Sequence, residues 1–306
     1  MKTTPILVTG GTGTLGRHVV QQLRTLGRNV RVLSRRVRTS SDGIEMTAGD
    51  LSTGAGVEAA VQDVDVIVHC AGGARGDDKK ARHLLRAAMV AGTHHVVTIS
   101  VVGADRVPVV TAVDRAMFAY FASKRAAERV VAQSGVPWTT LRATQFYDLC
   151  LLVAQYMAKL PVIPVPMGFR FQPVDAGEVA SRLVELALGA PAGLVPDIAG
   201  PRVYGVDDLL RGYLNAVDKR RVLMPIRLPG RAARAVAAGA NLAPERAVGR
   251  LTWEEFLAGR TGEGSLFMSS ASGTSFTVSC TAAVTSIWLA AVSPATRAAT
   301  LTVLPR

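Results

Sequence analysis

A tyrosine and a lysine four residues apart form a pair with an evident chemical use. Tyr120 and Lys124 lie in the segment YFASKRAAE, which favours a helix, so their spacing places both side chains on one helix face. An ammonium group beside a phenol favours the phenolate and lowers the phenol pKa from about 10 towards neutrality. The pattern predicts a general acid and base pair. The alternative is a helix that only lines a binding pocket.

A glycine-rich loop near the N-terminus indicates the ligand beside which this pair would act. The loop follows a short apolar run and opens a helical pattern, which is the context that gives the glycine motif its meaning. Glycines let the backbone approach a pyrophosphate closely, and the helix N-terminus offers free N–H groups. The alternative is a purely structural turn. We expect a dinucleotide on the loop residues Gly10, Gly11, Thr12, Gly13, Thr14, Leu15 and Gly16.

The residues that end the second expected strand indicate which dinucleotide binds. A domain that prefers NAD usually carries an acidic residue at this place, where it bonds the ribose hydroxyls. Here the chain has Ser34, Arg35 and Arg36 instead. Because an arginine fork suits a 2′-phosphate, we expect NADP as the cofactor. NAD remains the alternative, in which case the arginines form only a solvated basic loop.

Further cofactor contacts are expected where the third and fourth strands end. Asp50 closes the third strand, next to Leu51, and is placed to meet the adenine edge. Ala71 and Gly72 end the fourth strand and would flank the cofactor. His69, in the same strand, is interpreted as a packed histidine rather than a catalytic one.

Strand-like and helix-like segments alternate over the first 145 residues. Such alternation predicts an α/β protein with a doubly wound parallel sheet, the Rossmann fold. Strands are expected at 5–10, 29–35, 44–50, 64–72, 94–100 and 138–144, with helices at 15–26, 77–92 and about 116–133.

The alternation loosens after residue 145. A helix at 175–188 with Asp175 as its cap, and a capping box at 251–259, predict a small C-terminal substrate lobe over about 145–260. Residues 1–260 would then form one NAD(P)-binding domain. Ligands gather beyond the carboxyl ends of parallel strands, so we expect substrate contacts there from Gln145, Phe146 and Phe171. Such a partly aromatic pocket suits a small carbonyl or quinone-like compound.

The last segment, 261–306, differs in composition from the rest. It has no charged residue between Glu263 and Arg297, and Ser, Thr, Ala and Gly dominate it. Its most apolar part, 276–292, contains several Ser and Thr residues, which argues against a membrane span. We expect a low-complexity, disordered tail.

The net charge and the cysteines limit which partners, metals and cellular locations are expected. The net charge is +12, but the basic residues are spread along the chain without interleaved aromatics. This distribution argues against nucleic acid and favours a phosphate-rich small ligand. The three cysteines show no metal-ligand spacing, so no metal is expected, and a reducing cytoplasm is the simplest location. The N-terminal apolar run is too short for a signal-peptide core.

The motifs resemble those of the atypical, or extended, short-chain dehydrogenases, most of all the NmrA-like NAD(P)-binding branch. They are TGGTGTLG, AGD, HCAGG, TISVVGAD, YFASKRAAE with GVPWTTLRATQF, and FQPVDAGEVA, and the resemblance covers roughly residues 4 to 260. It implies a catalytic set of Ser100, Tyr120 and Lys124, with Lys124 also on the cofactor ribose. In active members a hydroxyl follows the fifth strand, whereas here Val101 and Val102 follow Ser100.

Three functions are consistent with these features. We expect an enzyme, an NADP(H)-dependent oxidoreductase acting on a small carbonyl or quinone-like substrate. The resemblance also implies an alternative, a non-catalytic NAD(P)-binding redox regulator that acts through a protein partner, and Val101 and Val102 favour it. The third is a nucleotide-sugar epimerase or dehydratase, against which Arg35 and Arg36 argue.

Overall fold

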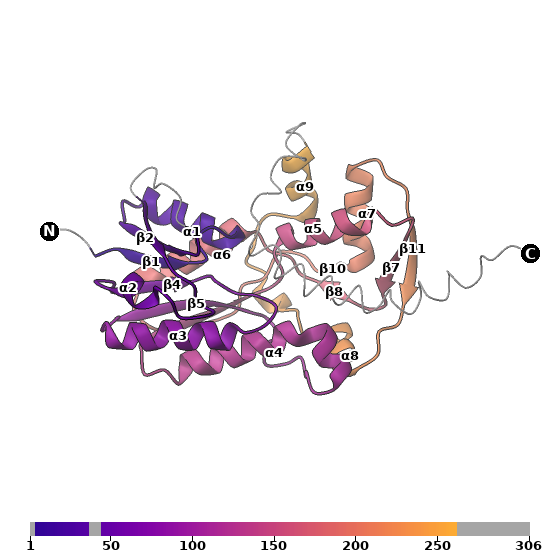
Figure 1. The fold of residues 1–306 in the computed structure, drawn as a ribbon. Helices are drawn as coiled ribbons and strands as arrows, with labels where there is room; N and C mark the ends of the chain where they lie inside the picture. Colours follow the sequence, from indigo (N-terminus) through magenta and orange to yellow (C-terminus); the bar gives the residue numbers. More distant parts are fainter. Residues whose placement is uncertain (1–3, 37–43, 262–306) are drawn as a thin grey trace, which may run out of the picture.

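Seven parallel strands form the central sheet of the computed structural model, which describes residues 4–36 and 44–261. The sheet runs outwards in both directions from β1 and β4, in the order β3-β2-β1-β4-β5-β6-β9 (Figure 1). This is the predicted doubly wound arrangement, and the prediction is confirmed. The strands are β1 (Ile6–Thr9), β2 (Val30–Ser34), β3 (Ile44–Ala48), β4 (Val66–His69), β5 (His95–Val101), β6 (Trp138–Ala143) and β9 (Gly193–Leu194).

Helices cover both faces of this sheet, so its strands are apolar on both sides. Alternate residues of β1 show the division, because Val8 packs towards α1 and α6 while Leu7 packs towards α2 and α3. Helix α4 lies beside α3 on the second face. The five helices are α1 (Thr14–Thr25), α2 (Val57–Val61), α3 (Asp77–Val90), α4 (Ala112–Ala132) and α6 (Ala176–Leu188).

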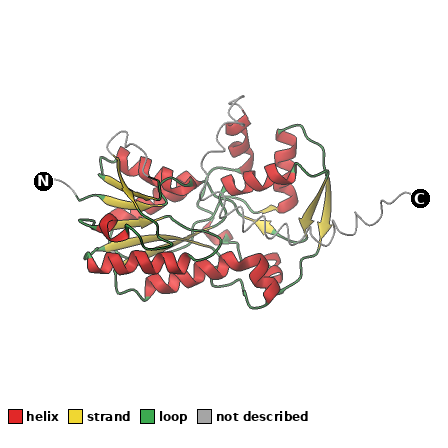
Figure 2. Ribbon diagram, viewed as in Figure 1, coloured by secondary structure: helices red, strands yellow, loops and turns green. Residues whose placement is uncertain are grey.

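A second group of elements packs around a core of its own, beyond the carboxyl end of β6 (Figure 2). The rings of Tyr147, Trp253 and Phe256 stack at centroid distances of 5.2–5.8 Å. Two small sheets accompany them, with β7 parallel to β11 and β8 antiparallel to β10. The elements are α5 (Tyr147–Met157), β7 (Val162–Pro166), β8 (Arg170–Phe171), β10 (Tyr204–Gly205), α7 (Val206–Ala216), β11 (Val222–Ile226), α8 (Arg231–Ala237), a 3-10 turn (Pro244–Arg246) and α9 (Trp253–Thr261).

The predicted helix caps are present. Asp175 Oδ1 accepts a hydrogen bond from the backbone N–H of Glu178 at 3.0 Å, at the start of α6. The capping box before α9 joins Thr252 and Glu255 in both directions. The predicted tail, 261–306, falls almost wholly outside the described residues, as does its apolar part, 276–292. No helix within the described ranges combines the length and apolarity needed to cross a bilayer.

Asp114 joins the two parts of the molecule at the start of α4. Its carboxylate is fully buried and accepts hydrogen bonds from the backbone N–H groups of Ala232 in α8, at 3.0 Å, and of Thr111, at 3.1 Å. The bond from Ala232 and those from the 110–111 segment lower the pKa of Asp114 to about 2. The ionised carboxylate therefore holds α8 against the first turn of α4.

We expect Asp114→Asn to lower the melting temperature by several degrees at about pH 7, because the amide cannot accept at both oxygen positions. A carboxylate with a lowered folded pKa stabilises above its unfolded pKa and stops doing so as the pH falls through the folded value. The difference from the parent protein should therefore shrink towards about pH 2. Thermal unfolding followed by circular dichroism measures both effects. The exposed Asp63, replaced by Asn, is the matched control and should change neither. An Asp114→Asn protein as stable as the parent would contradict the assignment.

Candidate functional site

The glycine loop brings the backbone after β1 directly against the backbone after β4. Gly10 has φ +70°, and a Cβ on it would lie 2.7 Å from the backbone nitrogen of Ala71. The turn is closed by the N–H of Gly13, which donates to the carbonyl of Gly10 at 2.9 Å. A Cβ on Gly16 would clash with the same carbonyl oxygen. Gly10 and Gly16 are therefore positions that accept only glycine.

Helix α1 begins immediately after this turn with its N-terminus free of a side-chain cap. Gly13 is the N-cap residue and Thr14 the first helical residue, and no side chain bonds the first N–H groups. Thr12 is exposed beside them, whereas Leu15 is buried beneath. An uncapped N-terminus with a close glycine backbone is a geometry that holds a pyrophosphate.

The expected 2′-phosphate residues stand at the carboxyl end of β2, the strand next to β1. Arg35 and Arg36 are exposed. The Ser34 hydroxyl donates to the carbonyl of Arg36 at 3.0 Å and so shapes the turn that carries them. The structure therefore gathers two guanidinium-bearing residues beside the glycine loop.

Asp50 and Leu51 form the turn after β3, the edge strand that lies beside β2. Asp50 Oδ1 accepts from the N–H of Ser52 at 2.8 Å, which fixes the turn. Leu51 is buried, and its carbonyl bonds Nδ1 of His83 at 2.7 Å. Both residues lie at the carboxyl edge of the sheet, on the side of the expected adenosine half.

The end of β4 forms the other wall of the loop. Ala71 and Gly72 follow the strand and are half-buried. His69 is packed inside it, with Nδ1 2.7 Å from the Thr9 hydroxyl. Burial and then the nearby Lys124 charge lower the pKa of His69 to about 4. This histidine is therefore neutral at physiological pH and has the bonding of a packed residue.

Tyr120 and Lys124 lie one turn apart on α4, as expected from their spacing. Lys124 Nζ is 5.7 Å from the centroid of the half-buried Tyr120 ring. The helix is bent two residues before the tyrosine, where Phe118 has φ −123° and ψ 19°. Lys124 also forms an ion pair with Asp77 in the first turn of α3, at 3.0 Å. Asp77 was not among the residues predicted for the site.

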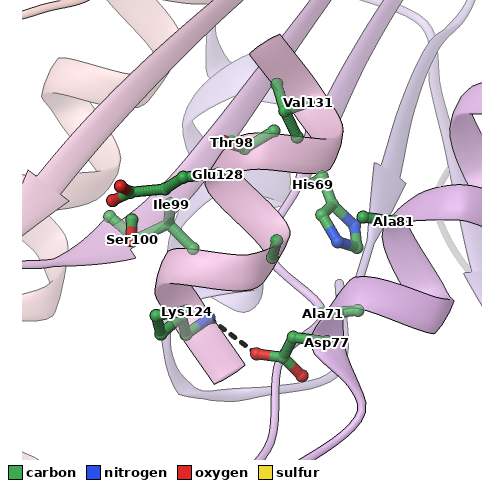
Figure 3. Close-up of a pocket in the computed structure, with 11 residues that line it drawn as sticks. His69, Ala71, Asp77, Ala81, Thr98, Ile99, Ser100, Lys124, Glu128 and Val131 are labelled. Atoms are coloured by element: carbon green, nitrogen blue, oxygen red, sulfur yellow. Dashed lines mark ion pairs between the residues drawn. The ribbon is translucent and has the colours of Figure 1, made fainter. Parts of the chain in front are cut away.

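Ser100 and Lys124 line the same small cavity between β4, β5, α3 and α4 (Figure 3). The volume is about 10 Å³, which is room for one water molecule. Ser100 is 6% exposed, and within the described residues its Oγ has no hydrogen-bond partner. Lys124 and Asp77 also line the cavity, whereas Tyr120 is not part of its lining. The structure thus places Ser100 and Lys124 in the lining of one cavity to which Tyr120 does not contribute.

A second buried ion pair fixes α4 on the sheet. Arg142 at the end of β6 bonds both carboxylate oxygens of Glu128 at 2.8 Å and lies 2.9 Å from Asp105. These acids raise the pKa of Arg142 further, against the effect of burial. Glu128 is one turn beyond Lys124, so the contact holds the lysine-bearing turn in place. Sequence reasoning missed this pair, because its members lie on a helix and on the strand that follows it, and no local spacing links the two.

The expected substrate residues meet where the sheet joins the lobe. The carbonyl of Gln145 accepts from the N–H of Val174 at 2.8 Å, which ties the end of β6 to the segment after β8. Phe146 precedes α5, and Phe171 in β8 packs on the lobe core. All three are half-buried. Phe146 packs against the core of the sheet and Phe171 against that of the lobe, so the three residues lie near the junction of the two.

No cluster of three or more His, Cys, Asp or Glu side chains suited to a metal ion occurs within residues 4–36 and 44–261.

A model of a family described as NAD(P)H-binding matches residues 10–149, from the glycine loop to the start of α5. The matched segment is an NAD(P)-binding domain of the kind found in the NmrA-like, short-chain dehydrogenase-type proteins. Its cofactor class is therefore NAD(P), held by an oxidoreductase-type domain.

Curated relatives support the same family. The chain is 31% identical to (4-alkanoyl-5-oxo-2,5-dihydrofuran-3-yl)methyl phosphate reductase of Streptomyces griseus over 144 residues, which is 46% of this chain and only 48% of the relative. It is 27% identical to ceramide reductase of Caulobacter vibrioides over 245 residues, 74% of each chain.

A solved structure supports the fold. The NADPH-dependent quinone oxidoreductase of Escherichia coli, in complex with NADPH, superposes with a TM-score of 0.70 and 18% identity, covering 83% of this chain and 99% of that one. At this identity the likeness concerns the fold alone.

We expect Gly16→Ala to weaken NADPH binding at least tenfold, because the added Cβ forces the Gly10 carbonyl and the start of α1 apart. Isothermal titration calorimetry measures the dissociation constant. The matched control is Gly259→Ala, a glycine in helix α9 with nothing within 4 Å of the added Cβ, which should bind normally. Equal binding by the two variants would rule out the loop as the pyrophosphate site.

Proposed function

We propose that this protein is an NADPH-dependent oxidoreductase that reduces a small carbonyl or quinone-like compound. The observation that carries the proposal is the pair Arg35 and Arg36 at the end of β2, beside a glycine loop and without an acid in this place. The names of the relatives agree, since two are reductases and the structural neighbour is a quinone oxidoreductase complexed with NADPH.

The proposed cofactor site follows the carboxyl edge of the sheet. The loop residues 10–16 hold the pyrophosphate, and Ser34, Arg35 and Arg36 hold the 2′-phosphate. Asp50 and Leu51 border the adenine. Ala71 and Gly72 flank the cofactor, and Lys124 bonds the nicotinamide ribose. NADPH, when bound, supplies the hydride for the reaction.

The proposed proton chemistry belongs to α4. Reduction of a carbonyl adds a hydride to carbon and a proton to oxygen, and Tyr120 donates that proton. Lys124 stands beside the tyrosine ring and orients the ribose. Ser100 completes the set from the small cavity that it lines together with Lys124. Gln145, Phe146 and Phe171 enclose the substrate, and their partly aromatic character suits a planar carbonyl or quinone.

Cofactor choice tests the arginine assignment. We expect NADPH to bind at least tenfold more tightly than NADH, about 1.4 kcal/mol, because the guanidinium groups meet the 2′-phosphate. Replacing both Arg35 and Arg36 with Ser should abolish the preference in calorimetric titrations. Arg28→Ser is the matched control, since this exposed arginine precedes the opposite end of the same strand. NADH binding as tightly as NADPH in the parent protein would refute the assignment.

Measuring turnover tests whether Tyr120 donates the proton. We expect Tyr120→Phe to reduce kcat at least a hundredfold against a panel of quinones and small carbonyls, with the NADPH dissociation constant unchanged. NADPH oxidation followed by absorbance gives the rate. Tyr156→Phe is the control, because Tyr156 also lies beside a lysine, Lys159, but on the exposed face of α5. Undiminished turnover in Tyr120→Phe would exclude the proton role. Tight NADPH binding by a parent protein that turns over no compound would favour the regulatory alternative.

A further inference from the structure

The ion pair between Asp77 and Lys124 is almost completely withdrawn from solvent. Their side chains are 2% and 7% exposed, and Lys124 Nζ lies 3.0 Å from Asp77 Oδ2 (Figure 3). A buried ammonium without a partner is costly and tends to lose its proton. Asp77 therefore keeps a charged lysine inside the wall of the proposed cofactor site.

Asp77 is itself held in place from two directions. Its backbone N–H donates to the hydroxyl of Ser123 on α4 at 3.2 Å, next to Lys124 in the chain. Its other carboxylate oxygen lies 3.2 Å from Nζ of Lys80. The residue starts α3, where the helix dipole favours a carboxylate. The position of the carboxylate is thus determined by two helices at once.

The protein encloses the lysine head. The adjoining cavity, about 10 Å³, has room for one water-sized group, so the contact with Asp77 rather than lack of space keeps the ammonium where it is. His69, in the same lining, is neutral and adds no charge that would compete for Asp77. An ammonium has three N–H donors, and the ion pair with Asp77 limits the positions from which they can reach a ligand.

We infer that Asp77 is a positioning residue, which holds the Lys124 ammonium in the orientation that bonds the nicotinamide ribose. The inference rests on the proposed function. Asp77 acts only through Lys124, so its removal should affect the nicotinamide half of the cofactor and leave the adenosine half alone. An ion pair with a purely structural role would instead loosen the whole domain and weaken both halves together.

Two ligands separate these effects. NADPH spans the whole site, whereas adenosine 2′,5′-bisphosphate carries the 2′-phosphate and lacks the nicotinamide ribose. We expect Asp77→Asn to weaken NADPH about tenfold in calorimetric titrations and to leave the bisphosphate within about twofold of the parent value. Lys124→Met should show the same pattern. Asp78→Asn is the matched control, because this neighbour on α3 pairs with the exposed Arg82 and should change neither constant.

Each result decides the inference. Equal weakening of both ligands, or of neither, in Asp77→Asn would overturn it while the cofactor proposal stands. A parent protein that binds neither ligand would overturn the cofactor proposal itself. If Asp77→Asn does not fold, as judged by thermal unfolding, Asp77→Glu replaces it, since it keeps a negative charge beside Lys124 but displaces the ammonium. Asp77→Glu should weaken NADPH selectively, and parent-like binding of both ligands would again overturn the inference.

Discussion

The backbone contact between Gly10 and Ala71 is the constraint on which the rest of the site depends. It lies where the strand order changes direction, between β1 and β4, and no side chain at residue 10 would leave room for it. The contact sets α1 at a defined place above the sheet edge, with its first N–H groups uncapped. Ligands of doubly wound sheets bind at such a switch point. The arginines after β2 and the helices after β4 and β5 are useful only because this turn places them around one crevice.

Helix α4 is the second fixed part, and buried charges hold it. Glu128 pairs with Arg142 on the sheet, Lys124 with Asp77 on α3, and Asp114 accepts from the first turn of α8. Buried ion pairs contribute little net stability compared with apolar packing, but losing one partner is costly. Their value here is geometric, because they prevent the helix from sliding on an otherwise apolar surface. A reacting group gains from such support, since small displacements cost large factors in rate.

The strands and helix starts that the sequence predicted correctly are those determined by residues close to one another in the chain. Short apolar runs identified the main strands, and Asp175 and Thr252 marked the starts of helices because caps act within one turn. The strands of two residues, such as β8 and β10, have no periodicity to detect. Asp77 was missed because DDKK has the composition of a solvated helix start, and its partner belongs to a helix much later in the chain. The sequence also could not predict which face of β5 carries Ser100, because both faces of that strand are buried and show no polar alternation.

The two ends of the proposed site differ in their electrostatics, and this difference defines how the cofactor would be recognised. Arg35 and Arg36 are exposed, so their attraction for a phosphate acts over a distance and weakens as salt screens it. At the other end Asp77 pairs with both Lys124 and Lys80, so its charge offsets one of the two positive charges, and the Lys124 pair is almost fully buried. Hydrogen bonds from the positioned lysine then contribute more to recognition at that end than attraction over a distance does. Charge would therefore select the phosphate-bearing half, and geometry would place the nicotinamide beside Tyr120.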